Sequence, residues 1–112
     1  MMLELHYSDG YVVTTHAIAD AVMRYAKSLA EHKASDLITV PISTTEGAAT
    51  SSMLIGPASQ LYTTPHTGFA VRLDDESAVM DLLSRNDRLL HPPASPGEYP
   101  FEEDDPWYEE SF

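Results

Sequence analysis

The residues of this chain whose types could support chemistry are five histidines and a scatter of serine, threonine, aspartate and glutamate side chains. The histidines stand singly, and no two lie three or four residues apart on a predicted helix, the spacing that brings two imidazoles to one metal ion. The chain has no cysteine, which excludes a thiolate nucleophile, a cysteine zinc site and a disulfide framework. Gly47 and Gly56 stand alone and form no phosphate-binding loop. We therefore expect neither a metal nor a cofactor.

Two histidines could still belong to an active or ligand-binding site. His16 lies at the start of a predicted helix and His66 in a threonine-rich loop, where either could meet a Ser or Asp side chain as a general base. No Gly-x-Ser-x-Gly elbow accompanies them. Gly56 would permit close approach of a ligand, and Ser59 adds a hydroxyl nearby. One hypothesis is therefore a small α+β enzyme or ligand-binding domain with a pocket at these four residues. The pattern favours the other interpretation, surface or hydrogen-bonded histidines without a catalytic role.

The C-terminal segment 92–112 departs most clearly in composition from an ordinary domain. It holds seven acidic residues, no Lys or Arg, and four prolines within residues 92–100 that are typical of a polyproline-like spacer. Half of the chain's ten aromatic residues also lie there. Such rings are costly to leave in water, so we interpret them as anchors that dock on the body of the chain, on a second copy or on a partner protein. The alternative is a tail that only adds solubility. The anchors are Tyr99, Phe101, Trp107, Tyr108 and Phe112.

The charge distribution restricts the classes of partner. The formal net charge is −12, and residues 1–91 account for −5 of it, because they hold eleven acids against six bases. This charge repels nucleic acid phosphates and anionic membrane surfaces, so we expect neither partner, and it favours a basic protein. No stretch approaches the roughly 18 apolar residues of a membrane span, and no signal peptide is recognisable. The expectation is a cytoplasmic protein.

Two secondary-structure elements are predicted at the N-terminal end. Residues 3–7 alternate apolar and polar side chains, residues 11–14 continue a β-rich run, and Gly10 between them tolerates the positive φ of a turn. We expect a β-hairpin there. A helix follows over residues 16–32, because Thr15 offers an N-cap hydroxyl and apolar side chains recur at helical spacing. The expected buried face consists of Ile18, Val22, Tyr25 and Leu29.

The middle of the chain is predicted to form further strands. Residues 37–42 are β-branched and apolar, but Pro41 removes a ladder donor and so indicates an edge strand or a strand end. A hairpin loop at 44–47 leads to a partner strand over 52–56. After a Gly-Pro break, residues 59–63 continue that strand in a new direction.

A last strand and a second helix complete the prediction. Residues 68–73 form the strand, because Phe69, Val71 and Leu73 alternate with polar or small residues. The helix begins at 74–76, whose carboxylates suit a helix N-terminus, and Pro92 ends it. Its expected buried face consists of Val79, Leu82, Leu83, Asn86 and Leu90.

This order of elements predicts an α+β fold, with an antiparallel sheet of about four to five strands and two helices packed on one face. We expect one domain over residues 1–91, followed by the acidic tail 92–112. The favoured function is a small acidic protein-interaction module, inhibitor-like or antitoxin-like, that uses the tail to bind a basic partner. Two alternatives remain open. One is a self-assembling homodimer with the tail docked on a neighbour, and the other is the enzyme or ligand-binding domain described above.

Overall fold

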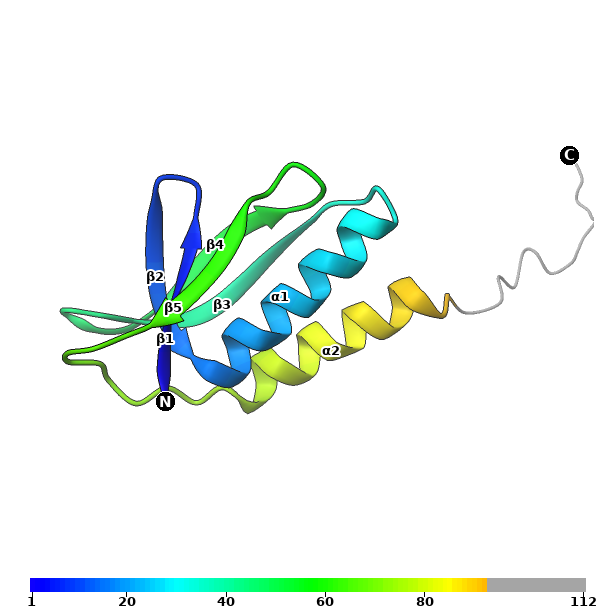
Figure 1. Cartoon of the computed structure of the whole chain (residues 1–112). Coiled ribbons are helices and arrows are strands. Elements are labelled where there is room, and N and C mark those ends of the chain that lie inside the picture. Colours follow the sequence, from blue (N-terminus) through cyan, green and yellow to red (C-terminus); the bar gives the residue numbers. More distant parts are fainter. Residues whose placement is uncertain (93–112) are drawn as a thin grey trace, which may run out of the picture.

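The chain folds as an α+β protein, with one five-stranded antiparallel sheet and both helices on the same side of it (Figure 1). The structure is a computed structural model and describes residues 1–92. The predicted fold class is confirmed. In chain order the elements are β1 (Met2–Tyr7), β2 (Gly10–Thr15), α1 (His16–Glu31), β3 (Asp36–Thr44), β4 (Gly47–Ile55), β5 (Leu61–Pro65) and α2 (Glu76–Leu90).

The predicted N-terminal hairpin and first helix are confirmed. β1 and β2 pair up to Tyr7↔Gly10, which leaves a two-residue turn in which the positive φ of 59° belongs to Ser8 and not to Gly10. Helix α1 begins as predicted, because the Thr15 hydroxyl accepts a bond of 3.1 Å from the Ile18 amide. The predicted buried face of α1 is buried throughout, and its residues are Ile18, Val22, Tyr25 and Leu29.

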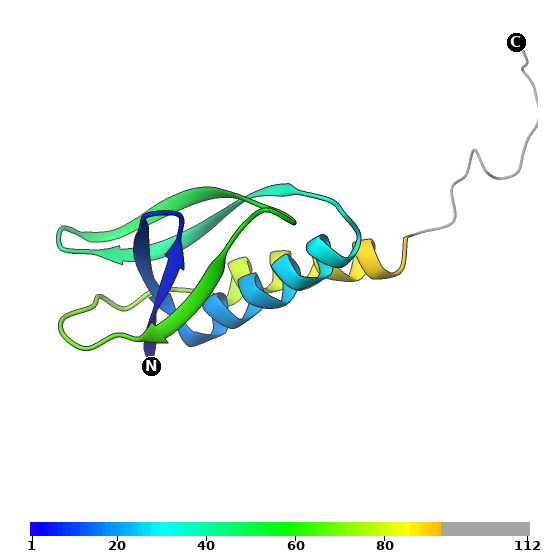
Figure 2. The same cartoon turned by 45° about the horizontal axis from the view of Figure 1, so that its top comes forward.

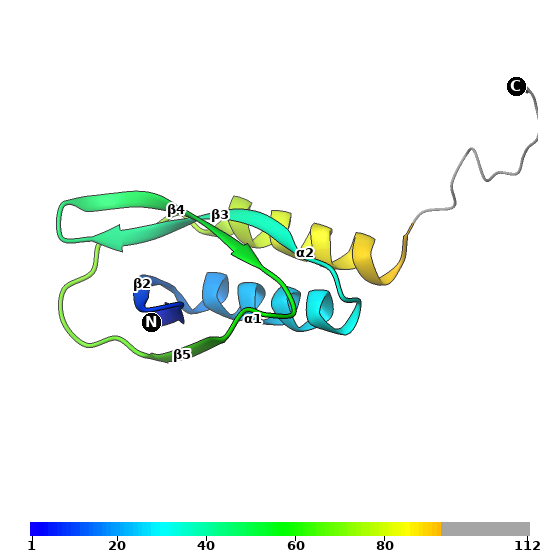
Figure 3. The ribbon, with the colours of Figure 1, turned by 90° about the horizontal axis from the view of Figure 1, so that it is seen from above.

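The sheet has the order β4-β3-β2-β1-β5, so β4 and β5 lie on opposite edges although only residues 56–60 connect them. The sheet must curl for so short a segment to join its two edges. From above, the β3–β4 hairpin and β5 lie on two sides of the β1–β2 hairpin, with α1 beneath the gap between them (Figure 3). The Tyr7 hydroxyl of β1, the strand next to β5, donates to the Leu54 carbonyl of β4, which holds β1 close to the β4 edge at this end of the sheet.

The core lies between the curled sheet and α1, and both helices lie against the same side (Figure 2). It is built from side chains that the strands direct toward the helices, chiefly Leu5, Ile38, Val40 and Ile55. Burial of such aliphatic groups stabilises the fold by roughly 1.5–3 kcal/mol each. Helix α2 contributes Leu82 as its fully buried residue and packs mainly against α1.

Pro41 does not mark an edge strand, because β3 lies between β4 and β2. Pro41 also lies inside β3 and not at its end, so the prediction of an edge strand or a strand end is wrong. The missing amide of Pro41 nevertheless explains why the pairing of β3 with β2 is short. The Pro41 carbonyl accepts a bond of 2.8 Å from the Thr14 hydroxyl of β2, so the main-chain groups of Pro41 point toward β2. The ladder between β2 and β3 consists of the single pair Val13↔Ser43. The proline therefore lies where this ladder stops.

Two further predictions are wrong. Residues 68–73 form no strand, and the place beside β1 is taken by β5. The Phe69 side chain is 78 % exposed, and the Val71 amide bonds to the Ser43 hydroxyl at 2.8 Å rather than to a ladder. On α2, Leu83 and Leu90 were expected to be buried and are 48 % and 42 % exposed. The buried face of α2 is narrower than predicted, because the helix packs against α1 and hardly against the sheet.

Candidate functional site

Three rings from three adjacent strands lie side by side on the sheet face away from the helices. His6 of β1 is paired in register with Tyr11 of β2 on one side and Tyr62 of β5 on the other. The His6 and Tyr62 rings are stacked, with centroids 4.3 Å apart and an interplanar angle of 4°, and Tyr11 is tilted at 5.2 Å. Tyr11 is 54 % and Tyr62 58 % exposed. We call these three residues the ring row.

Polar contacts with Thr64 and Glu4 hold the His6 ring in place. Its Nε2 lies 3.0 Å from the Thr64 hydroxyl and 3.4 Å from Oε1 of Glu4. The Thr64 hydroxyl donates its one proton to Glu4 at 3.3 Å, so the His6 Nε2–H donates to the hydroxyl oxygen. Because His6 cannot rotate freely, the Tyr62 ring stacked on it is also held in place.

His66 ends this network and ties the following loop to the sheet. Its Nδ1 lies 3.0 Å from Oε2 of Glu4 and its Nε2 lies 3.2 Å from the Phe69 carbonyl. Both partners only accept hydrogen bonds, so the imidazole must carry both protons to satisfy them. The hydrogen bond to Glu4 and that to Phe69 raise the pKa of His66. The bond from His66 also lowers the pKa of Glu4.

The strands around the ring row contain no lysine or arginine. None of the six Lys and Arg residues of the chain lies in β1 to β5, and four of them lie on the two helices. The helix-free face instead presents hydroxyls, the rings and two leucines, Leu37 and Leu54, which are 60 % and 56 % exposed. Such a surface is unsuited to phosphate groups and suited to cationic or apolar groups of a protein.

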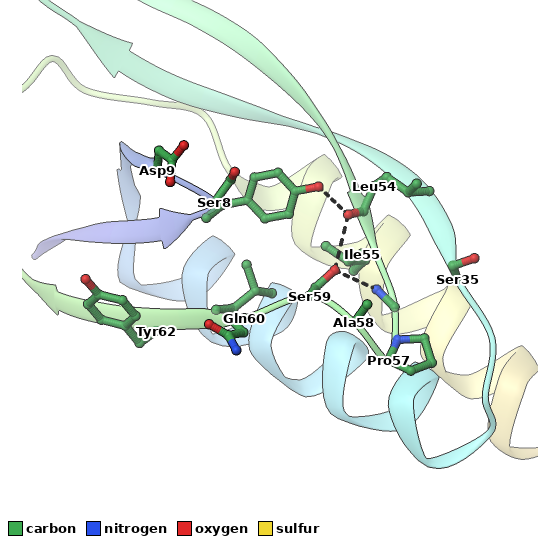
Figure 4. A pocket seen from close by; sticks show the side chains of 13 residues that line it. Ser8, Asp9, Ser35, Leu54, Ile55, Pro57, Ala58, Ser59, Gln60 and Tyr62 are labelled. Carbon is green, nitrogen blue, oxygen red and sulfur yellow. Dashed lines mark hydrogen bonds between the residues drawn. The ribbon is translucent and has the colours of Figure 1, made fainter.

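A hollow lies beside the β1–β2 turn, where the two edges of the sheet meet, and Tyr62 of the ring row is one of its lining residues (Figure 4). It is open, has a volume of about 940 Å³, and is lined by the β1–β2 turn and the connection from β4 to β5. The Ser59 hydroxyl organises that connection, because it accepts from the Gly56 amide at 3.0 Å and donates to the Leu54 carbonyl at 3.3 Å. Gly56 is required here, since a Cβ on it would lie 2.7 Å from that of Ser35.

The residues predicted for one pocket are distributed over separate places. Gly56 and Ser59 line the hollow together. His16 lies exposed at the start of α1, and His66 bonds to Glu4 on β1, and neither lines the hollow. Glu4, His6 and Thr64 were not singled out from the sequence, although alternation in residues 3–7 already places Glu4 and His6 on one face. The five predicted tail anchors lie outside the described residues.

Within residues 1–92 no group of three or more His, Cys, Asp and Glu side chains is arranged to hold a metal ion. No helix in this part of the chain is long and apolar enough to cross a membrane. No protein-family model, curated protein or solved structure matches the chain. The ring row, the hydrogen bonds that hold it and the edges of the sheet are therefore the features of the described residues from which a function is inferred.

Proposed function

We propose that this protein is a small protein-interaction module whose ring row binds a basic segment of a partner protein. The observation that carries the proposal is the pair of half-exposed tyrosine rings, Tyr11 and Tyr62, on a face without Lys or Arg. An arginine guanidinium stacks well on such rings, and tyrosines of this kind are frequent anchors in protein interfaces.

The geometry supports this proposal because Tyr62 is already positioned. Its inner face rests on His6, which Thr64 and Glu4 hold in turn, so binding costs little side-chain entropy. The face of the Tyr62 ring that is turned away from His6 is left for a ligand. Cation–π contacts of this kind contribute about 0.5–2 kcal/mol each, which corresponds to roughly 2-fold to 30-fold in affinity.

The charge of the whole chain supports a basic partner. A net charge of −12 accelerates the encounter with a cationic protein and disfavours acidic ones. The segment 92–112, with its seven acids, would contribute further attraction, and its five aromatic residues would be additional anchors. In this proposal the ring row supplies specificity for cationic side chains and the tail strengthens the attraction.

The proposal is tested with a 12-residue Arg-Gly repeat peptide, titrated into the full chain and followed by NMR and fluorescence anisotropy. We expect signals of the ring row to shift, and we expect Tyr62→Leu to weaken binding several-fold, because leucine keeps apolar bulk but lacks the ring face. A Glu-Gly repeat peptide of the same length should not bind.

The matched control is Phe69→Leu, the same type of change at an exposed aromatic residue outside the ring row. Both variants keep the charge of the chain, so a difference between them reports the rings and not the general attraction of opposite charges. Equal affinity of the wild type, Tyr62→Leu and Tyr11→Leu for the Arg-Gly peptide would contradict the proposal.

A further inference from the structure

The two edges of the sheet differ in their protection against pairing with another strand. β5 is five residues long and ends at Pro65, and short edge strands and prolines are common protections. β4 is nine residues long and contains neither a charged residue nor a proline. Natural proteins usually interrupt an edge of that length with lysine, proline or a bulge. β4 is therefore the edge that is open to another strand.

Alternate residues of β4 direct their main-chain groups away from β3. The hairpin closes at the pair Thr44↔Gly47 around a two-residue loop, so Gly47 and every second residue after it bond to β3. The residues between these bonded positions have their N–H and C=O groups on the outer side. They are Ala48, Thr50, Ser52 and Leu54.

Hydrogen bonds from side-chain hydroxyls agree with this outward orientation, and they show which outward main-chain groups of β4 already have a partner. The Leu54 carbonyl accepts from the hydroxyls of Tyr7 and Ser59, which lie beyond the outer side of β4. Leu54 is therefore already engaged. Within residues 1–92, no hydrogen bond reaches the outward main-chain groups of the other three residues, Ala48, Thr50 and Ser52.

We propose that β4 pairs antiparallel with β4 of a second copy of this chain, about a two-fold axis at Thr50. This register places Thr50 opposite Thr50 and Ala48 opposite Ser52. Each such pair exchanges two N–H···O bonds, so the three pairs form about six, and every free outward group is used. A register centred on Ser51 would instead oppose Ala48 to Leu54, whose carbonyl is engaged.

A second copy fits this edge because the strand is self-complementary. Antiparallel self-pairing in this register places Gly47 beside Met53, so a large side chain meets a residue without one. The nearest charged residue, Glu46 in the hairpin loop, comes to lie beside Leu54 of the other copy and not beside a carboxylate. Two chains of net charge −12 repel each other, and pairing through β4, which carries no charged residue, brings no like charges of the two strands together. The two sheets would join into one.

Cross-linking tests both the contact and its register. The chain has no cysteine, so Thr50→Cys introduces a single thiol. Residues opposed in a hydrogen-bonded pair have Cα atoms about 5.5 Å apart, within the range of about 4.4–6.8 Å that a disulfide spans. We expect mild oxidation of the full-length variant to give a covalent dimer.

Two single-cysteine variants are the controls. In Ala48→Cys the thiols of the two copies are separated by four residues along the strand, about 13 Å, so no disulfide should form. Thr39→Cys places a thiol on β3, on the same sheet face but off the edge. The proposed pairing is overturned if Thr50→Cys forms the dimer no faster than these controls.

A second experiment needs no thiol. Analytical ultracentrifugation of the wild-type chain should give twice the single-chain mass of 12.4 kDa. Thr50→Pro and Thr50→Lys should each raise the dimer dissociation constant at least tenfold. Proline is compatible with the fold there, because the Thr50 amide faces outward and makes no hydrogen bond to β3. Pro41, which lies opposite Thr50 on β3, likewise has its nitrogen turned away from β4. Circular dichroism checks that both variants remain folded.

A single-chain mass for the wild type at several hundred micromolar would refute the dimer, as would two variants that sediment like the wild type. Thr50 lies on β4, away from the ring row on β1, β2 and β5. The Arg-Gly peptide should therefore bind Thr50→Pro as it binds the wild type. The proposed dimer and the proposed peptide-binding function can therefore be tested independently of each other.

Discussion

His66 is the residue whose protonation state follows most directly from its contacts. Its ring bonds to the Glu4 carboxylate and to a carbonyl, and these bonds raise its pKa while that of Glu4 is lowered. A raised His66 pKa gives stability that is present below pH 6.5 and is lost as the pH rises through the folded value. The lowered Glu4 pKa gives stability that is lost as the pH falls through its own folded value. The pair therefore stabilises the fold between these two limits.

We predict that Glu4→Gln destabilises the protein more at pH 6 than at pH 9. At pH 6, below the unfolded histidine pKa value of 6.5, the wild type holds the charged pair. The contribution of the pair falls as the pH rises through the raised pKa of His66, so removing the carboxylate costs less at the higher pH. Urea unfolding at the two pH values measures this, and an NMR titration should show a lower His66 pKa in the variant. Glu46→Gln, which removes the same charge from an exposed loop, is the control. An equal loss of stability for Glu4→Gln at both pH values would contradict the assignment.

At the scale of elements, α2 is attached by a polar cluster in addition to its apolar contacts, among which Leu82 is fully buried. Asp36 at the start of β3 accepts from the Tyr25 hydroxyl of α1 at 2.6 Å and from Nη1 of Arg85 of α2 at 2.8 Å. Burial and the bond to Asp36 raise the pKa of Tyr25 to about 12. One carboxylate thus joins both helices to the sheet.

We predict that Asp36→Asn costs about 1–2 kcal/mol of unfolding free energy, because two hydrogen bonds lose their charged acceptor. It should also lower the Tyr25 pKa, which absorbance titration of the tyrosines measures. The control is Asp81→Asn, which removes an exposed bond of 2.9 Å from Nε of the same Arg85 and should cost about 0.3–0.5 kcal/mol. An equal loss of unfolding free energy in the two variants would show that Asp36 contributes no more than an exposed ion pair does.

The success of prediction from the sequence also differs between elements. Helix α1 was predicted almost to its ends, because its cap and its buried stripe are local signals. The strand at 68–73 was predicted wrongly, because alternation of Phe69, Val71 and Leu73 cannot show that β5 already occupies the edge beside β1. The ring row and the bond of His66 to Glu4 depend on that same register, which joins residues 62 positions apart in the chain.

At the scale of the whole molecule, like charges oppose folding. The net charge of −12 falls to −5 when residues 93–112 are removed, because seven acids leave and no base does. We predict that the melting temperature of the full chain rises between 10 and about 200 mM NaCl, as salt screens the repulsion, and that a chain of residues 1–92 shows a smaller rise. Thermal unfolding of both chains measures this. The same salt dependence in both would show that repulsion from the acidic segment does not limit stability.

The position of β1 inside the sheet, between β2 and β5, affects how the protein folds as it emerges from the ribosome. β1 can pair with β2 early, because the two form a local hairpin. It can pair with β5 only after residues 61–65 have been synthesised. The nascent chain therefore passes through a stage in which β1 and β4 both present unpaired backbone. Chaperones that recognise extended segments would act at that stage, and the closing of β5 onto β1 is the late, long-range step of folding.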